Sequence, residues 1–141
     1  MIENKKQEET LAMRYFREKY PAFPKGKLIK SESPDFILKT GRHHTTGIEL
    51  TRLITPAGGF QSPTALIEKL ENLIRKKNEK LPLYRKNNFN ELWLLITCDD
   101  LNLSGNIRLD EVLSDIHLKN GFDKVFLLDL FEGVVYSEGR L

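Results

Sequence analysis

A mixed α/β domain, in which helices pack on a sheet, is the fold class that the sequence predicts. The chain has 141 residues, of which 40% are hydrophobic and 30% charged, so it can build one soluble core but has no room for two. Helical and β-like patterns follow one another as helix, three strands, helix, strand, helix and two strands. We therefore expect a single domain over residues 1–141.

The first part of the chain is expected to contain a helix and three strands. A helix over residues 5–19 ends at Pro21 and Pro24, and its apolar side is formed by Leu11, Ala12, Tyr15 and Phe16. Three β-like segments follow at residues 27–30, 35–40 and 46–54. Because a short turn with glycine and polar residues joins the last two, we expect them to pair as an antiparallel hairpin.

The second part is expected to add two helices and three strands. The strongest helical pattern begins at Ser62 and Pro63 and continues to Leu81, with apolar residues at three- and four-residue steps. Residues 91–97 are nearly all apolar and too few for a buried helix, so they predict a central strand covered on both faces. The last elements are a helix over residues 109–119 and strands over residues 122–130 and 133–138.

Basic and acidic residues are unevenly distributed along the chain. Residues 1–90 contain 18 Lys and Arg against 10 Asp and Glu, whereas residues 91–141 contain 4 against 10. The net charge of +2 is thus the sum of a +8 part and a −6 part. A polyanion is accordingly a candidate partner for the first part.

Several protein classes are excluded by composition. Cys98 is the single cysteine, which excludes an intramolecular disulfide framework and the cysteine-rich zinc motifs. The longest apolar run covers residues 92–96, far below the roughly 20 residues that span a bilayer. The first ten residues have no apolar stretch to serve as a signal peptide. We expect a cytoplasmic protein that does not insert into a membrane.

Two carboxylates are expected to meet at the rim of the sheet. Asp35 opens one strand, and 13 residues separate it from Glu49, which lies in the antiparallel neighbour. In that neighbour the period of two puts Glu49 and Thr51 on one face and Ile48 and Leu50 on the other. Two adjacent carboxylates repel one another, and a shared Mg²⁺ with water and phosphate oxygens is the usual resolution.

The motif around these acids resembles that of the PD-(D/E)XK nuclease superfamily over roughly residues 5–97. Pro34-Asp35 stands where the family has its Pro-Asp pair, and Glu49 begins the stretch that matches its E-x-K motif. The resemblance implies a restriction endonuclease-like fold with an α-β-β-β-α-β core, here with an extra C-terminal helix and strands. It also implies an endo- or exonuclease in which Asp35 and Glu49 bind Mg²⁺ or Mn²⁺ and phosphodiester bonds are hydrolysed.

Thr51 departs from the family pattern because it occupies the place of the motif lysine. Either Thr51 positions the attacking water, or another lysine has taken over that role, or the protein binds without cleaving. Lys77 is the candidate replacement, because it falls on the apolar stripe of the second helix and could extend its ammonium group to Asp35 and Glu49. The alternative is that Lys77 simply reaches solvent.

A third metal ligand is implied on the first helix, from which the family often contributes a glutamate. Glu8 shares a face with Leu11, Ala12 and Tyr15, so we expect it to point toward the sheet. Glu9 is the competing choice. Stabilisation of the helix by its dipole is the alternative reason for either acid.

Positive charge is concentrated on the second helix and directly after it. Between residues 69 and 86 the cationic residues are Lys69, Arg75, Lys76, Lys77, Lys80, Arg85 and Lys86. Their proximity to the carboxylate pair suggests that Lys69, Arg75, Lys76 and Lys80 contact nucleic acid, with DNA preferred over RNA. A solvated helix face is the alternative. So small a domain has little surface for base readout, which leaves a homodimer or a larger complex open.

A rival motif spans residues 100–111. Asp100, Asn102, Ser104, Gly105 and Glu111 match the template of a calcium loop. A buried strand precedes the loop where an EF-hand needs a helix, so a polar turn that caps the next helix is the alternative. Two other functions therefore stay open: a catalytically degenerate member of the same fold that binds nucleic acid or protein, and a Ca²⁺-binding module.

Overall fold

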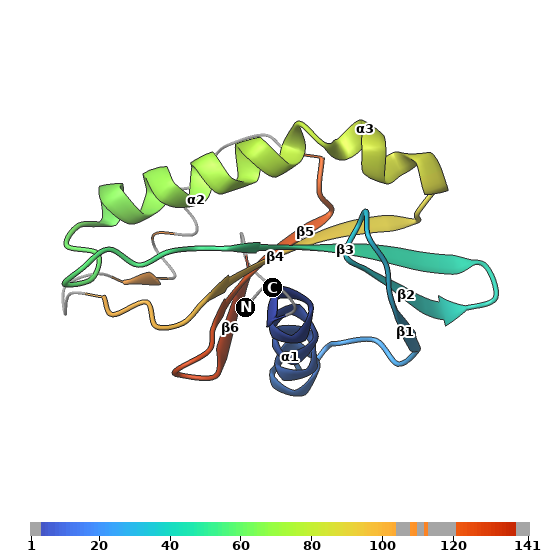
Figure 1. Cartoon of the computed structure of the whole chain (residues 1–141), viewed down its shortest axis with the longest axis horizontal. Coiled ribbons are helices and arrows are strands. Elements are labelled where there is room, and N and C mark those ends of the chain that lie inside the picture. Colours follow the sequence, from blue (N-terminus) through green and yellow to red (C-terminus); the bar gives the residue numbers. More distant parts are fainter. Residues whose placement is uncertain (1–3, 104–107, 110–111, 113–120, 138–141) are drawn as a thin grey trace.

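A six-stranded mixed sheet forms the centre of the molecule, in the order β1-β2-β3-β4-β5-β6 (Figure 1). The computed structural model describes residues 4–103, 108–109, 112 and 121–137. The strands are β1 (Lys27–Lys30), β2 (Phe36–Gly41), β3 (His44–Arg52), β4 (Glu91–Cys98), β5 (Lys124–Asp129) and β6 (Val134–Ser137). The helices are α1 (Asn4–Lys19), α2 (Pro63–Asn78), the short α3 (Leu81–Tyr84) and the 3-10 helix η1 (Arg85–Asn87).

The strand pairing combines antiparallel and parallel ladders. β1, β2 and β3 pair antiparallel, β3, β4 and β5 pair parallel, and β6 returns antiparallel to β5. The predicted order of strands and of the first two helices is confirmed, and so is the antiparallel hairpin of β2 and β3. Most of the predicted helix over residues 109–119 lies outside the described residues.

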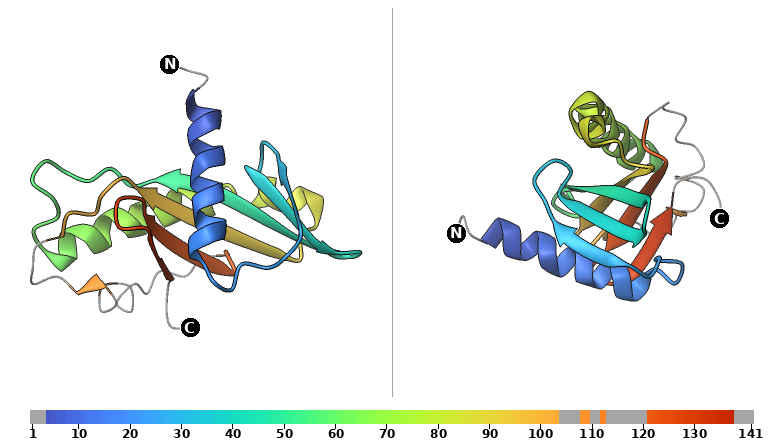
Figure 2. Two further views of the ribbon diagram at one scale, coloured as in Figure 1. Left: turned by 90° about the horizontal axis from the view of Figure 1, so that it is seen from below. Right: turned by 90° about the vertical axis from the view of Figure 1, so that its right-hand side faces the viewer.

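The sheet is covered on both faces, by α1 on one side and by α2 with α3 on the other (Figure 2). Because side chains alternate along a strand, β4 sends Trp93 and Leu95 into the core under α1 and Leu94 and Ile96 into the core under α2. The prediction of a central strand covered on both faces is therefore confirmed. Among the described residues, no helix is long and apolar enough to cross a membrane.

The predicted buried face of α1 is partly wrong. Leu11 is 58% exposed, whereas Met13, which was not expected on that face, is buried. Aromatic packing explains this rotation, because the rings of Phe16 and Tyr20 lie 5.0 and 4.8 Å from the ring of Phe126 and fix which side of the helix faces the sheet.

The second helix begins where the sequence predicts and ends earlier. Ser62 caps it, since its hydroxyl oxygen accepts a hydrogen bond from the Ala65 N–H at 3.2 Å. α2 ends at Asn78 rather than continuing to Leu81. Pro82 disfavours a continuous helix because it has no N–H and restricts the residue before it, and the chain forms the separate helix α3 instead.

Candidate functional site

Asp35 and Glu49 meet where β2 begins and β3 nears its end. The register pairs Phe36 with Ile48, so Asp35, the residue directly before β2, lies opposite Glu49. The Asp35 N–H donates a hydrogen bond to Glu49 Oε1 at 3.2 Å, and the Leu50 N–H donates to Asp35 Oδ2 at 2.9 Å. These bonds hold both acids against the backbone of the neighbouring strand.

A glycine in β3 provides the space that this arrangement needs. A Cβ atom on Gly47 would lie 2.8 Å from Pro34 Cγ and 2.8 Å from Leu92 Cδ2, which is closer than side-chain atoms approach. The absence of a side chain at Gly47 therefore lets the residue before Asp35 pack directly on β3.

Lys77 reaches the carboxylate pair from the last turn of α2. Its Nζ donates a hydrogen bond to Glu49 Oε2 at 2.7 Å, and both side chains are largely withdrawn from solvent. A charge-assisted bond of this length is among the stronger polar contacts in proteins. Of the two places that the sequence left open for Lys77, the structure shows the one beside the carboxylates.

The environment of Asp35 makes its carboxyl group less acidic. The pKa of Asp35 is raised from 3.8 to about 6, mainly by burial and also by the neighbouring Glu49 carboxylate, while the hydrogen bond from Leu50 and the charge of Lys30 act in the opposite direction. A cation bound beside Asp35 and Glu49 would relieve the repulsion between them.

Tyr84 of α3 lies beside Glu49, and no motif in the sequence points to it. Its hydroxyl oxygen is buried and has no hydrogen-bond partner among the described residues. Burial and the negative charge of Glu49 raise the pKa of the Tyr84 hydroxyl, so it stays protonated and can donate. In the sequence Tyr84 is an aromatic residue two positions after Pro82. Only the break between α2 and α3 brings it to this position.

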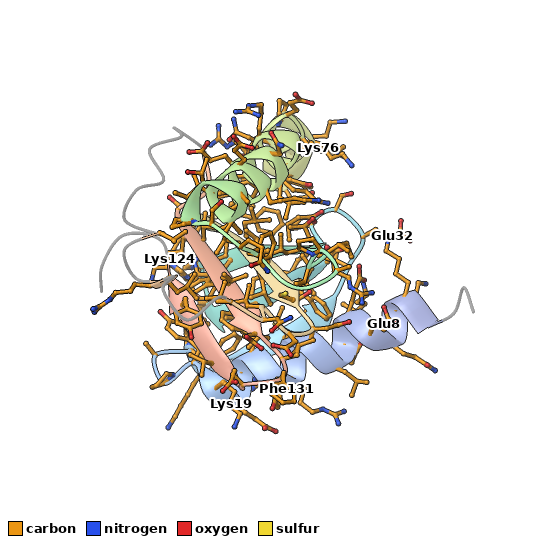
Figure 3. The ribbon with its side chains drawn as sticks, turned by 90° about the vertical axis from the view of Figure 1, so that its left-hand side faces the viewer. Glu8, Lys19, Glu32, Lys76, Lys124 and Phe131 are labelled. Atoms are coloured by element: carbon orange, nitrogen blue, oxygen red, sulfur yellow. The ribbon has the colours of Figure 1, made fainter. Side chains whose placement is uncertain are left out.

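A pocket of about 550 Å³ opens over these groups. Its walls come from α1, from the loop before β2, from the end of β3, and from α2 and α3; they include Lys5, Glu8, Glu9, Glu32, Asp35, Glu49, Thr51, Lys77, Lys80 and Tyr84. An adjoining hollow of about 460 Å³ adds Lys6 and Lys30. Figure 3 shows Glu8 and Glu32 on the same side of the molecule.

Both candidate acids of α1 line the pocket, and they differ in exposure. Glu8 lines the pocket, where its side chain is 65% exposed and lies 3.9 Å from Arg52 at the end of β3. Glu9 is only 17% exposed and pairs with Lys30 at 3.2 Å. Glu9 is therefore the less exposed of the two acids, and it lines both hollows together with Asp35.

Thr51 and Lys80 also line the pocket, whereas the three other predicted nucleic-acid contacts on α2 do not. Lys69, Arg75 and Lys76 are exposed on α2 and are absent from the pocket walls as far as the chain is described. Lys76 extends from α2 into solvent in Figure 3.

The donor set suits magnesium better than zinc. The described residues contain no group of three or more His, Cys, Asp or Glu that could hold a metal ion. Zinc sites need three or four protein ligands, whereas Mg²⁺ is commonly held by one or two carboxylates with water and substrate phosphates. Asp35 and Glu49 fit the second arrangement.

The proposed calcium loop lies largely outside the described residues, which omit 104–107 and 110–111. In its described part, Asp100 Oδ1 accepts a hydrogen bond from the Asn102 N–H at 3.1 Å. β4 ends at Cys98 directly before this segment, so a strand precedes it, as the sequence predicts.

Comparison with known proteins identified no relative of this chain. No protein-family model, curated protein or solved structure significantly matches the chain.

Proposed function

We propose that the protein is a Mg²⁺- or Mn²⁺-dependent nuclease with a restriction endonuclease-like core. One observation carries this proposal: the carboxylates of Asp35 and Glu49 lie together at a pocket, with the Lys77 ammonium 2.7 Å from Glu49. This combination provides two oxygen ligands and a cation that can act on a phosphate or on the attacking water.

The topology supports the proposed fold family. The chain forms a helix, three antiparallel strands, a helix and a strand in that order. Asp35 lies directly before the second strand of this series, and Glu49 lies on the third. Those are the positions that the resemblance to PD-(D/E)XK nucleases implies.

The site residues divide the chemistry among them. Asp35 and Glu49 would hold the metal, and Glu8 and Glu9 of α1, which line the same pocket, are the candidates for a third ligand. The metal, when bound, lowers the pKa of its water and screens the charge of the scissile phosphate. Lys77, released from Glu49, orients the attacking water or stabilises the charge that develops on the phosphate. Thr51 provides a hydroxyl group at the same pocket.

Cationic side chains on two sides of the pocket support a nucleic acid substrate. Lys5, Lys6 and Lys30 lie on the α1 and β1 side, and Lys77 and Lys80 lie on the opposite side. A strand that passes the carboxylates would place its phosphates near both groups. The exposed Lys69, Arg75 and Lys76 would contact only a substrate that continues along α2.

A second candidate function is binding without cleavage. The ion pair between Lys77 and Glu49 already neutralises one carboxylate, and Thr51 replaces the motif lysine. In such a protein Lys77 would be a permanent counter-ion, and the metal site would be lost. The two functions differ in one measurable property, which is whether a divalent cation displaces Lys77 from Glu49.

Cleavage of labelled DNA and RNA tests the proposal. The wild type, Asp35→Ala and Glu49→Ala are compared in Mg²⁺, Mn²⁺ and EDTA, with Glu68→Ala on the exposed side of α2 as the matched control. We expect cleavage by the wild type and the control only, and only with a divalent cation. Equal cleavage by all four proteins would assign the activity to a contaminant, and salt-sensitive binding without cleavage would favour the second function.

A further inference from the structure

The hydroxyl group of Tyr84 has an environment that needs an explanation. Tyr84 is 1% exposed, and its hydroxyl oxygen is buried with no hydrogen-bond partner among the described residues. A buried polar group without a partner costs free energy, and a phenylalanine at this position would avoid that cost. We therefore expect the Tyr84 hydroxyl group to form a hydrogen bond in another conformation of the site.

The ring of Tyr84 is fixed in place. It belongs to the core between the sheet and α2, and it packs on the ring of Phe122 with a centroid distance of 6.3 Å. The hydroxyl group, which lies close enough to Glu49 for that carboxylate to raise its pKa, is consequently held in place. Its oxygen is shielded from solvent, so it acts through a neighbouring side chain rather than by direct contact with a substrate.

Glu49 is the side chain through which Tyr84 can act. One Glu49 oxygen accepts from the Asp35 N–H and the other from Lys77 Nζ. Under the proposed function, Lys77 leaves Glu49 when a metal ion binds, and the carboxylate loses the donor that orients it. Carboxylates that bind metals are usually oriented by a further hydrogen bond, and a neutral donor does not repel the metal as an ammonium group does.

We infer that Tyr84 is a positioning residue for Glu49, whose carboxylate accepts the Tyr84 hydroxyl hydrogen bond when Lys77 moves away. The inference rests on the proposed metal-dependent function. It gives α3 a role in that function, because this short helix carries Tyr84, which replaces Lys77 as the hydrogen-bond donor to Glu49.

Binding of Mn²⁺ alone, followed by calorimetry, tests the inference in Tyr84→Phe. We expect about 10-fold weaker binding of Mn²⁺, which is the low end of the effect of losing such an outer hydrogen bond. The thermal stability of the metal-free protein should stay the same or rise, because the lost hydroxyl group has no partner there. Tyr136→Phe is the matched control, since Tyr136 packs at the edge of the same core; it should leave Mn²⁺ binding unchanged.

The outcomes separate the inference from the proposed function. Unchanged Mn²⁺ affinity in Tyr84→Phe, beside a wild type that binds Mn²⁺, would overturn the role of Tyr84 alone. A metal-free Tyr84→Phe protein that is clearly less stable than the wild type would also overturn it, since that result indicates a structural role. A wild type that binds no Mn²⁺ would overturn both.

A second measurement leaves Tyr84 intact. In Lys77→Met the ammonium partner of Glu49 is absent, so the Tyr84 hydroxyl should donate to Glu49 even without metal. NMR of protein labelled at tyrosine Cζ should then show a shifted Tyr84 signal in Lys77→Met relative to the wild type. Identical Tyr84 signals in the two proteins would contradict the inference.

Discussion

Glu49 in β3 and Asp129 in β5 are carboxylates of the same sheet, and they are the two charged side chains that are buried in the described part of the chain. Asp129 accepts hydrogen bonds from the N–H groups of Leu101 and Glu132 at 3.3 and 3.0 Å. Glu49 accepts from one backbone N–H and from the ammonium group of Lys77, and it lies beside a second acid at a pocket.

The difference between the two acids concerns which partners can leave. Backbone N–H groups are fixed by the chain, so the partners of Asp129 cannot move away from it. Asp129 therefore stabilises the turns after β4 and β5. A lysine side chain at the end of a helix can move, so Glu49 can exchange its cation for another. Exchangeable partners are the property that distinguishes a candidate ligand from a structural carboxylate.

The largest expected effect comes from neutralising each acid in turn. Glu49→Gln should lower metal-dependent cleavage by about 1,000-fold, because loss of a metal ligand removes several kcal/mol of transition-state stabilisation. Asp129→Asn should leave the rate of the folded protein nearly unchanged. Single-turnover cleavage rates measure both. Equal losses of rate would remove the distinction between the two acids.

Removing the movable partner should separate binding from catalysis. Lys77→Met should bind Mn²⁺ more tightly, because no ammonium group competes for Glu49, and should cleave about 100-fold more slowly. Calorimetry and cleavage rates measure the two effects, with Lys69→Met on the same helix as the control. Weaker Mn²⁺ binding in Lys77→Met would show that the lysine supports the metal rather than competing with it.

Removing the fixed acid should act on stability instead. Asp129→Ala leaves the N–H groups of Leu101 and Glu132 without their acceptor, which should lower the free energy of unfolding by about 1–3 kcal/mol. Urea denaturation measures this change. An unaltered unfolding midpoint would show that these N–H groups find other partners.

The pH dependence of Mn²⁺ binding should show the contribution of Asp35, the acid beside Glu49. With a pKa of about 6, Asp35 must lose its proton before it binds a cation, so Mn²⁺ affinity should rise as the pH increases from 5 to 7 and then level off. Calorimetry at pH 5, 6, 7 and 8 measures this rise. An affinity that is constant over this range would contradict the role of Asp35 as a ligand.

Stability of the metal-free protein should change in the opposite direction. The pKa of Asp35 is higher in the folded state than its ordinary value of 3.8, so the folded state binds the proton more tightly, and stability falls as the pH rises from about 4 to about 6. Asp35→Asn should therefore be more stable than the wild type at pH 8, by about 1 kcal/mol once solvent screening is allowed for. Denaturation at pH 4 and pH 8 measures the difference, which should vanish at pH 4.

The smallest effect concerns two lysines, Lys76 in α2 and Lys80 directly after it. Lys80→Gln should weaken binding of a DNA oligonucleotide and reduce its salt dependence by about one phosphate contact. Lys76→Gln should have less effect, because Lys76 lies away from the pocket walls. Fluorescence anisotropy at several salt concentrations measures both, and a larger effect of Lys76 would place the nucleic acid along α2.

Most of the fold and half of the site could be predicted from local patterns. A hairpin between Asp35 and Glu49 fixes which residues face each other, and the stripe of α2 identifies Lys77, because both depend on short-range periodicity. The rotation of α1 could not be predicted in the same way, since contacts with Phe126 set it. Tyr84 was missed because its significance depends on a helix break and on the distant Glu49.

A crystal soaked with Mn²⁺ tests the central claim most directly. We expect one anomalous peak between the carboxylates of Asp35 and Glu49, with Lys77 Nζ moved away from Glu49 Oε2. A crystal with no peak at this position and an intact bond between Lys77 and Glu49 would contradict the metal-dependent function.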